Sequence, residues 1–240
     1  MREGGKIMAQ IFQELREYTQ PGMTGKEVDK WVERKILSYG AGIAYYEPEV
    51  NFPGSICISV NNELIHGTPK DIPFEEGDKV SFDLDIYYKG YFTDSAFTMI
   101  VGEKGSPAVK KMIQVTESSM WEGIEQVKPG AHIGDVGSAV EKVLRKGHLG
   151  VIENYIGHGI GKSMHELPEV PNYGKKGHGY KLVEGDTICI EPMSCLGKPA
   201  NFVDKDDNWT VKMKDGSIGC HCEHTVLVTK DGYEVLTLPD

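Results

Sequence analysis

The sequence predicts an α+β fold with two similar halves around a central antiparallel sheet. Apolar residues recur at helical spacing in two pairs of segments, and each pair is followed by runs rich in β-branched and aromatic residues. Two short motifs also recur at one common distance along the chain. Together these observations predict a helix–helix–strand unit that occurs twice.

The first half begins with two amphipathic helices. Apolar positions within residues 7–15 share one helical face, and the pattern ends at Pro21-Gly22. Thr24 and Glu27 have the spacing of a capping box, so a second helix starts there and continues until Gly40.

Three strands follow these helices. Ser55–Val60, Asp78–Tyr88 and Tyr91–Val101 are rich in the residues that favour strands. Lys89-Gly90 separates the last two, so these are expected to form a hairpin with a two-residue turn.

The second half repeats this order. Ser106-Pro107 is a favourable helix start, Pro129-Gly130 ends that helix, and a fourth helix stops at Gly147. Because no linker or low-complexity tract separates the halves, residues 1–240 are expected to form a single domain.

Two motifs support an internal duplication. Pro129-Gly130 follows Pro21-Gly22 by 108 residues, and the stretch 184–191 follows the similar stretch 76–83 by the same 108. Coincidence is the alternative, because Pro-Gly and Glu-Gly-Asp are ordinary turn sequences. The last aligned pair of the repeat is Asp83 with Glu191, a carboxylate within each predicted strand.

Composition argues against several classes of function. The chain has 26 Lys and Arg against 36 Asp and Glu, for a net charge of −10, and no basic stripe, which disfavours nucleic-acid binding. A polar N-terminal stretch and the lack of long apolar runs disfavour a secretion signal and a membrane span. Five cysteines are few and odd in number, which favours a reducing cytoplasm over a disulfide framework.

The motif Cys220-His221-Cys222 is disfavoured as a zinc site. In a strand the side chain of His221 would point away from those of both cysteines, and no second cysteine pair is available.

The predicted hairpin gathers carboxylates on one face. Its register places Asp85 opposite Asp94 and Asp83 opposite Ala96, so the three aspartates share that face. Burying them without compensation would cost several kcal/mol each, so the face either is solvated or holds cations.

Further residues could complete a cation site. Each of them alone is equally compatible with a solvated strand end or loop, but jointly the carboxylates and an imidazole suit Mn, Fe, Co or Zn in a hydrolytic centre. The candidates are, in chain order, His66, Asp83, Asp94, His158, His165, Glu191 and Glu223.

The methionine aminopeptidases, above all their short type I bacterial form, are similar to this chain in the order of five residues: Asp83, Asp94, His158, Glu191 and Glu223. The resemblance covers nearly the whole sequence, with segments such as SICISVNNELIHGTP, GHGIGKSMHELPEV, ICIEPM and CEHTVLVT. It implies the pita-bread fold, whose two pseudo-symmetric halves enclose a dinuclear metal site. That implication agrees with the 108-residue repeat.

The resemblance also implies roles for these residues. Asp83 would bind one divalent metal ion, Asp94 and Glu223 would bridge two, and His158 and Glu191 would complete the second; the ions would be Co, Mn, Fe or Zn. The implied reaction is removal of the initiator methionine by water activated at the two metals, within a single catalytic metallopeptidase domain. Coordination of the free amine of the substrate would confine cleavage to the first residue.

Other positions would contact the substrate. The resemblance assigns His165 to the scissile carbonyl and His66 to the scissile amide nitrogen, with Glu191 as a proton shuttle. Phe52, Cys57 and Trp209 would form the methionine pocket, although ordinary core packing is an equally good explanation of each. The chain departs from the family at Tyr45–Asn51 and at His221, where a Gln is common.

Two other readings stay open: an Xaa-Pro peptidase of the same fold, and a non-catalytic pita-bread module that binds peptide. The expected partner is the N-terminus of a peptide or nascent chain, with transient ribosome contact left open. The protein is expected to be a cytoplasmic monomer without membrane or sequence-specific nucleic-acid partners.

Overall fold

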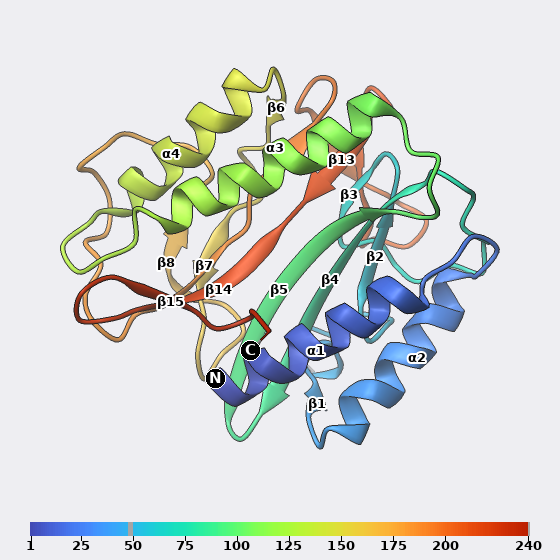
Figure 1. The fold of residues 1–240 in the computed structure, drawn as a ribbon, viewed down its shortest axis with the longest axis horizontal. Coiled ribbons are helices and arrows are strands. Elements are labelled where there is room, and N and C mark those ends of the chain that lie inside the picture. The colour runs from blue at the N-terminus through green and yellow to red at the C-terminus, as the bar shows by residue number, and fades with distance from the viewer. Residues whose placement is uncertain (48–49, 240) are drawn as a thin grey trace.

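The computed structural model describes residues 1–47 and 50–239, and four α-helices lie within these ranges (Figure 1). The first two lie together on one half of the molecule, and the last two lie together on the other half. The helices are α1 (Arg2–Tyr18), α2 (Gly25–Ser38), α3 (Pro107–Ile124) and α4 (Ile133–Lys146), with a short 3₁₀ helix, η1 (Ala44–Tyr46).

Local capping explains where the helices start. Thr24 Oγ1 accepts a hydrogen bond from Glu27 N at 3.2 Å, and the Glu27 carboxylate accepts one from Thr24 N at 2.8 Å, which confirms the predicted capping box of α2. Ser106 caps α3 through the backbone N of Val109, and Pro107 is the first helical residue.

Most strands belong to one sheet, and the lengths of these strands differ. In the described part of the chain this main sheet has nine strands, in the order β1-β4-β5-β14-β9-β7-β8, with β2 paired to β4 and β15 paired to β14. The strands are β1 (Gly42–Ile43), β2 (Cys57–Val60), β3 (Glu63–Ile65), β4 (Lys79–Tyr88), β5 (Tyr91–Ile100), β6 (Gly150–Val151), β7 (Gly157–Gly159), β8 (Glu166–Val170), β9 (Thr187–Ile190), β10 (Met193–Cys195), β11 (Asn201–Val203), β12 (Val211–Met213), β13 (Gly219–His221), β14 (Glu223–Val228) and β15 (Tyr233–Val235).

The β4–β5 hairpin has the register expected from its turn. Tyr88 pairs with Tyr91, and Asp85 pairs with Asp94. Both turn residues adopt positive φ, 50° at Lys89 and 89° at Gly90, as a type I′ hairpin turn requires. Because side chains alternate between the two faces of a strand, this register places the aspartates on a common face.

The structure confirms two pseudo-symmetric halves. An isolated backbone bridge joins Thr24 to Pro73, and an equivalent bridge joins His132 to Lys181, with both partners shifted by 108 residues. The strands β4 and β9, which carry the repeated motif, lie on either side of β5 and β14 at the centre of the main sheet. The halves therefore meet between β5 and β14.

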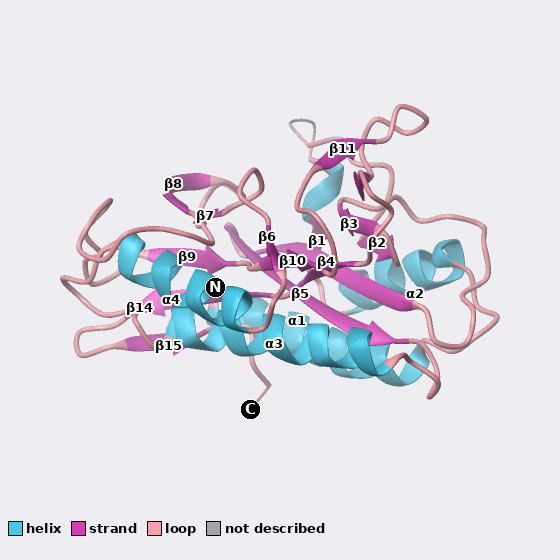
Figure 2. Cartoon of the chain, turned by 90° about the horizontal axis from the view of Figure 1, so that it is seen from above, coloured by secondary structure: helices cyan, strands magenta, loops and turns pink. Residues whose placement is uncertain are grey.

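Each half has its own hydrophobic core beneath the sheet. Leu15, Val32 and Leu84 belong to the first core, whereas Val136 and Ile188 belong to the second. Figure 2 shows α1–α4 on one face of the sheet and the short strands β7, β8 and β11 toward the other. None of the described helices has a stretch that is long and apolar enough to cross a membrane.

Candidate active site

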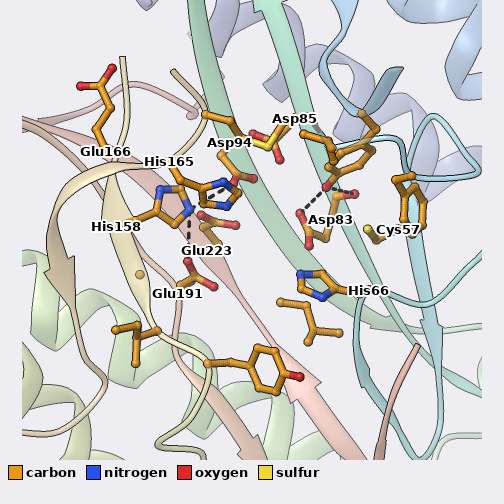
Figure 3. A pocket seen from close by; sticks show the side chains of 18 of the residues that line it. Cys57, His66, Asp83, Asp85, Asp94, His158, His165, Glu166, Glu191 and Glu223 are labelled. Atoms are coloured by element: carbon orange, nitrogen blue, oxygen red, sulfur yellow. Dashed lines mark hydrogen bonds and ion pairs between the residues drawn. The ribbon is translucent and has the colours of Figure 1, made fainter. Parts of the chain in front are cut away.

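A cavity of about 560 Å³ lies between the sheet and the short strands and loops that cover its second face (Figure 3). Its described lining residues come from strands, loops and η1 rather than from α1–α4. The cavity brings together all ten residues that the sequence analysis singled out as catalytic, substrate-binding or metal-binding: Phe52, Cys57, His66, Asp83, Asp94, His158, His165, Glu191, Trp209 and Glu223.

The carboxylates come from the four central strands of the sheet. β4 carries Asp83, β5 carries Asp94, Glu191 directly follows β9, and Glu223 begins β14. All are buried, with exposed fractions between 1% for Glu223 and 7% for Asp83. Asp85 lies beside them on β4 and is 3% exposed, as the hairpin register predicts.

His158 contacts two of these acids. Its Nε2 lies 3.7 Å from Asp94 Oδ2 and 3.5 Å from Glu191 Oε1. Its Nδ1 lies 2.9 Å from the backbone oxygen of Gly159, which can only accept, so Nδ1 carries the proton. The lone pair of Nε2 is therefore directed toward the carboxylates, as in a histidine that is ready to bind a metal.

Possible ligand atoms converge in two overlapping groups. Oxygens of Asp83, Asp85 and Asp94 lie within 4.8 Å of one another. A second group with the same mutual separation combines Asp94, His158, Cys189 and Glu223. Asp94 belongs to both groups.

Burial shifts the pKa of every member of this cluster toward its neutral form. Desolvation raises the pKa of Asp94 to about 7, and burial, reinforced by the charge of Asp94, raises the pKa of Asp83, Glu191 and Glu223 well above the usual range. Desolvation and the neighbouring His165 lower the pKa of His158 to about 4.

The donor set fits divalent metal ions. Within the described residues, Asp85 Oδ1, Asp94 Oδ1 and Glu223 Oε1 are buried without a hydrogen-bond partner. Buried, unpaired carboxylate oxygens are costly, and the neighbouring imidazoles do not compensate them, because the pKa of His158 is lowered to about 4 and that of His221 to about 3, which leaves both neutral at pH 7. Cations bound among these oxygens would remove that cost, and oxygen with imidazole nitrogen suits Mn, Fe, Co or Zn.

Two further histidines lie on opposite sides of the carboxylates. Figure 3 shows His165 next to His158 and His66 across the pocket. The rings of His158 and His165 are 4.4 Å apart, and the ring of His66 meets that of Tyr155 edge-on at 5.9 Å. Burial lowers the pKa of His165, and it lowers that of His66 to about 4, so both imidazoles are neutral at pH 7.

An apolar wall closes the cavity beside His66. Phe52 and Trp209 meet edge to face with their ring centroids 5.3 Å apart, and the thiol of Cys57 lies on β2 nearby. Phe52 is 4% exposed and Cys57 is 2% exposed, so these side chains also belong to the core. The wall can accept an apolar side chain of moderate length.

Sequence reasoning missed two residues of the site. The Tyr45 hydroxyl donates a hydrogen bond to Asp83 Oδ1 at 3.1 Å, and Cys189 contributes its sulfur to a ligand group. Tyr45 lies in the segment recognised as divergent, of which residues 48–49 are outside the described residues. The only signal for Cys189 was its position two residues before Glu191, on the same face of the strand.

His221, noted only as a departure from the family, also faces the site. It is 1% exposed, and its nitrogens lie within 4.0 Å of oxygens of Asp83, Glu191 and Glu223. Cys220 and Cys222 instead belong to the second hydrophobic core, as the alternation of side chains along a strand predicts.

Comparisons with known proteins agree with this geometry. The chain matches metallopeptidase family M24 over residues 1–230. It is 39% identical over 238 residues to methionine aminopeptidase 1 of Bacillus subtilis, which covers 99% of this chain and 94% of that protein.

Solved structures with this fold differ in how similar they are to this chain. The methionine aminopeptidase of Rickettsia prowazekii superposes with a TM-score of 0.96 at 37% identity and covers 99% of this chain and 95% of its own. A prolidase of Pyrococcus horikoshii reaches a TM-score of 0.74 at 23% identity, and the match covers only 61% of that chain, so the likeness is one of fold alone. This protein belongs to metallopeptidase family M24 and, within that family, to the methionine aminopeptidases.

Proposed function

We propose that this protein removes the initiator methionine from peptides and nascent proteins with the help of two divalent metal ions. The observation that carries the proposal is the cluster of buried, incompletely paired carboxylates and His158 at one wall of a cavity whose other wall is apolar. In this proposal residues 1–240 form one catalytic domain that acts as a cytoplasmic monomer.

Five residues would hold the metals. Asp83 would serve one ion, and His158 and Glu191 would serve the other. Asp94 and Glu223 would bridge both, which is supported by the central positions of β5 and β14 in the sheet. When bound, the ions supply Lewis acidity, which polarises the scissile carbonyl and makes water nucleophilic at neutral pH.

The protein's own groups would orient the substrate and move protons. Neutral His165 would donate a hydrogen bond to the carbonyl oxygen as negative charge develops there, and neutral His66 would contact the scissile amide nitrogen. Glu191 would accept a proton from the attacking water and pass it to the leaving amine. The three residues line the same cavity, which supports these assignments.

The apolar wall would select the first side chain. Phe52, Cys57 and Trp209 would surround the methionine thioether, since sulfur packs favourably against aromatic edges. Within this wall, the rings of Phe52 and Trp209 and the thiol of Cys57 carry no charge that could pair with a charged first side chain.

Hydrolysis of a matched pair of peptides tests the proposal. Metal-stripped protein is loaded with Mn or Co under reducing conditions and offered Met-Ala-Ser and Ala-Pro-Ala. We expect cleavage of the Met peptide alone and its loss on chelation. Preferred cleavage of the Pro peptide would assign the protein to the Xaa-Pro peptidases, and no cleavage despite bound metal would favour a peptide-binding module.

Variants connect that activity to the cluster. Asp94→Asn and His158→Ala are expected to lower kcat/KM by a factor of at least about 100, because each removes a metal ligand rather than a distant contact. His178→Ala is the matched control, since His178 is exposed on a loop and outside the described lining of the cavity. Equal activity of all three variants would overturn the ligand assignment.

A further inference from the structure

His221 is a buried histidine whose side chain has no hydrogen-bond partner among the described residues. Its imidazole is 1% exposed, and neither Nδ1 nor Nε2 forms a hydrogen bond. An unpaired imidazole in a protein interior costs free energy, so its retention needs a compensating contact.

Three carboxylates surround the imidazole of His221 and indicate which contact that is. Nε2 lies 3.7 Å from Glu191 Oε2 and 3.9 Å from Glu223 Oε2, while Nδ1 lies 4.0 Å from Asp83 Oδ2. These separations exceed hydrogen-bond length. They fall in the range expected for two ligand atoms that bind the same ion, because metal–ligand bonds of 2.0–2.2 Å allow neighbouring ligands to lie roughly 3 to 4 Å apart.

The positions of His158 and His221 around Glu191 are alike. His158 Nε2 approaches Glu191 Oε1 at 3.5 Å, and His221 Nε2 approaches Glu191 Oε2 at 3.7 Å. One carboxylate thus has an imidazole nitrogen beside each of its oxygens.

The internal repeat assigns His221 to a ligand position independently. Asp94 pairs with Asp85 across the β4–β5 hairpin, and His221 pairs with Met193, the residue 108 positions after Asp85. The pairs His224–Ile190 and Met193–His221 belong to one continuous register, so this equivalence extends along β13 and β14. His221 is therefore the counterpart of Asp94 in the second half of the molecule.

We propose that His221 is a further metal ligand of this site, with Nε2 as its donor atom beside Glu191 and Glu223. The inference rests on the proposed function, since it adds a residue to the same metal centre. A second imidazole makes the donor set richer in nitrogen, which favours Co and Zn over Mn. Once Nε2 is a ligand, the proton resides on Nδ1 and faces the carboxylate of Asp83.

Proton NMR of the cobalt-loaded protein counts the coordinated imidazoles directly. Stripped protein is titrated with Co²⁺ up to two equivalents, and the exchangeable, strongly downfield-shifted imidazole N–H signals are counted in H₂O and D₂O. We expect two such signals in the unmodified protein, from His158 and His221, and one in His221→Gln. A single signal in the unmodified protein would overturn the proposal whether or not the variant folds.

Calorimetric titration provides a second readout. Removal of a residue that hydrogen-bonds to a metal ligand typically weakens metal affinity 10- to 100-fold. Because His221→Gln would remove a ligand itself, it should weaken Co²⁺ binding at least about tenfold. It should weaken Mn²⁺ binding less, since Mn²⁺ depends less on imidazole nitrogen. His224→Gln is the matched control, because His224 is the next histidine in sequence but its ring packs near Trp121 and its Nδ1 contacts Thr237. The control should keep both N–H signals and the Co²⁺ affinity. Unchanged Co²⁺ affinity in His221→Gln would contradict the proposal.

Hydrolysis of Met-Ala-Ser by the same samples separates this inference from the proposed function. Cleavage by unmodified protein that shows only one imidazole signal would leave the function intact and remove His221 from the metal site. Absence of cleavage despite two signals would instead contradict the function and retain the ligand.

Discussion

Among single residues, Tyr45 contacts the carboxylate of Asp83, which we propose as a metal ligand. Its buried hydroxyl donates to Asp83 Oδ1 at 3.1 Å, and burial raises the pKa of Tyr45, so the hydroxyl keeps its proton. Partners that orient metal ligands typically contribute 10- to 100-fold to affinity. We therefore expect Tyr45→Phe to weaken Co²⁺ binding by roughly that factor in a calorimetric titration, with little change in fold.

The adjacent Tyr46 offers a matched control. Its hydroxyl approaches Glu33 at 3.4 Å on the surface, and its side chain is 52% exposed. Tyr46→Phe should leave the affinity for Co²⁺ unchanged. If Tyr45→Phe also left it unchanged, Asp83 would be held in place without the tyrosine.

Whether a site residue could be predicted from the sequence depended on how close to it in the chain its partner residues lie. The turn at Lys89-Gly90 sets the register that places Asp83 and Asp94 together, so that part of the site follows from local sequence. The contact of Tyr45 with Asp83 joins residues 38 positions apart and depends on how η1 packs, which no local pattern specifies.

At the scale of elements, the short strand β7 is held by close backbone packing. An added Cβ at Gly157 would lie 2.1 Å from the Cys189 oxygen of β9, and one at Gly159 would lie 2.3 Å from the Leu167 oxygen of β8. Glycines on both sides of His158 therefore allow neighbouring backbones to approach and fix the position of the imidazole.

Gly157→Ala should disturb both the strand and the metal site. Overpacking typically costs about 1–3 kcal/mol, so we expect a loss of this size in the free energy of unfolding measured with urea, together with weaker Co²⁺ binding. Gly232→Ala is the control, because an added Cβ there meets no atom within 4 Å. Equal stability and affinity of the two variants would show that β7 is not constrained by β9.

Long elements could be predicted from the sequence, and short ones could not. The helices and the β4–β5 hairpin have enough residues to display a period, whereas β6, β7 and β10–β13 have two or three residues each. The strand predicted from Ser55 also starts later, at Cys57, because Ser55 N and Oγ instead donate to Asp29 of α2.

In the whole molecule, the carboxyl groups of the two halves lie close together where the halves meet. Each half contributes a carboxylate at an equivalent position, Asp83 and Glu191, to one cavity that lies where the halves meet. The repeat could be predicted from the shared 108-residue offset. The pairing of β5 with β14 could not, since it joins residues about 130 positions apart and depends on how the halves dock.

This arrangement predicts that the metal-stripped protein loses stability as pH rises above about 6.5. A carboxyl whose pKa is raised in the folded state binds a proton there that the unfolded chain has already released, so the free energy of unfolding falls with pH by up to about 1.4 kcal/mol per pH unit and group. Asp94, with a pKa raised to about 7, and the further raised Asp83, Glu191 and Glu223 all act in this sense. Histidines with lowered pKa, such as His158 and His66, act in the opposite sense, and their effect fades above about pH 7.5, where unfolded imidazoles have lost their protons.

Urea unfolding at pH 6.5, 7.25 and 8 tests this expectation. Lys79, whose pKa is lowered to about 8, adds stability as pH rises only toward the upper end of this interval. The stripped protein should become less stable at each step. Asp94→Asn should lose less over the same interval, because the variant lacks one titrating carboxyl. Protein loaded with Co²⁺ should not show the fall, since bound cations favour the ionised carboxylates in the folded state. Stability of the stripped protein that stayed constant or rose from pH 6.5 to 8 would show that these carboxylates are already ionised in the folded chain without metal.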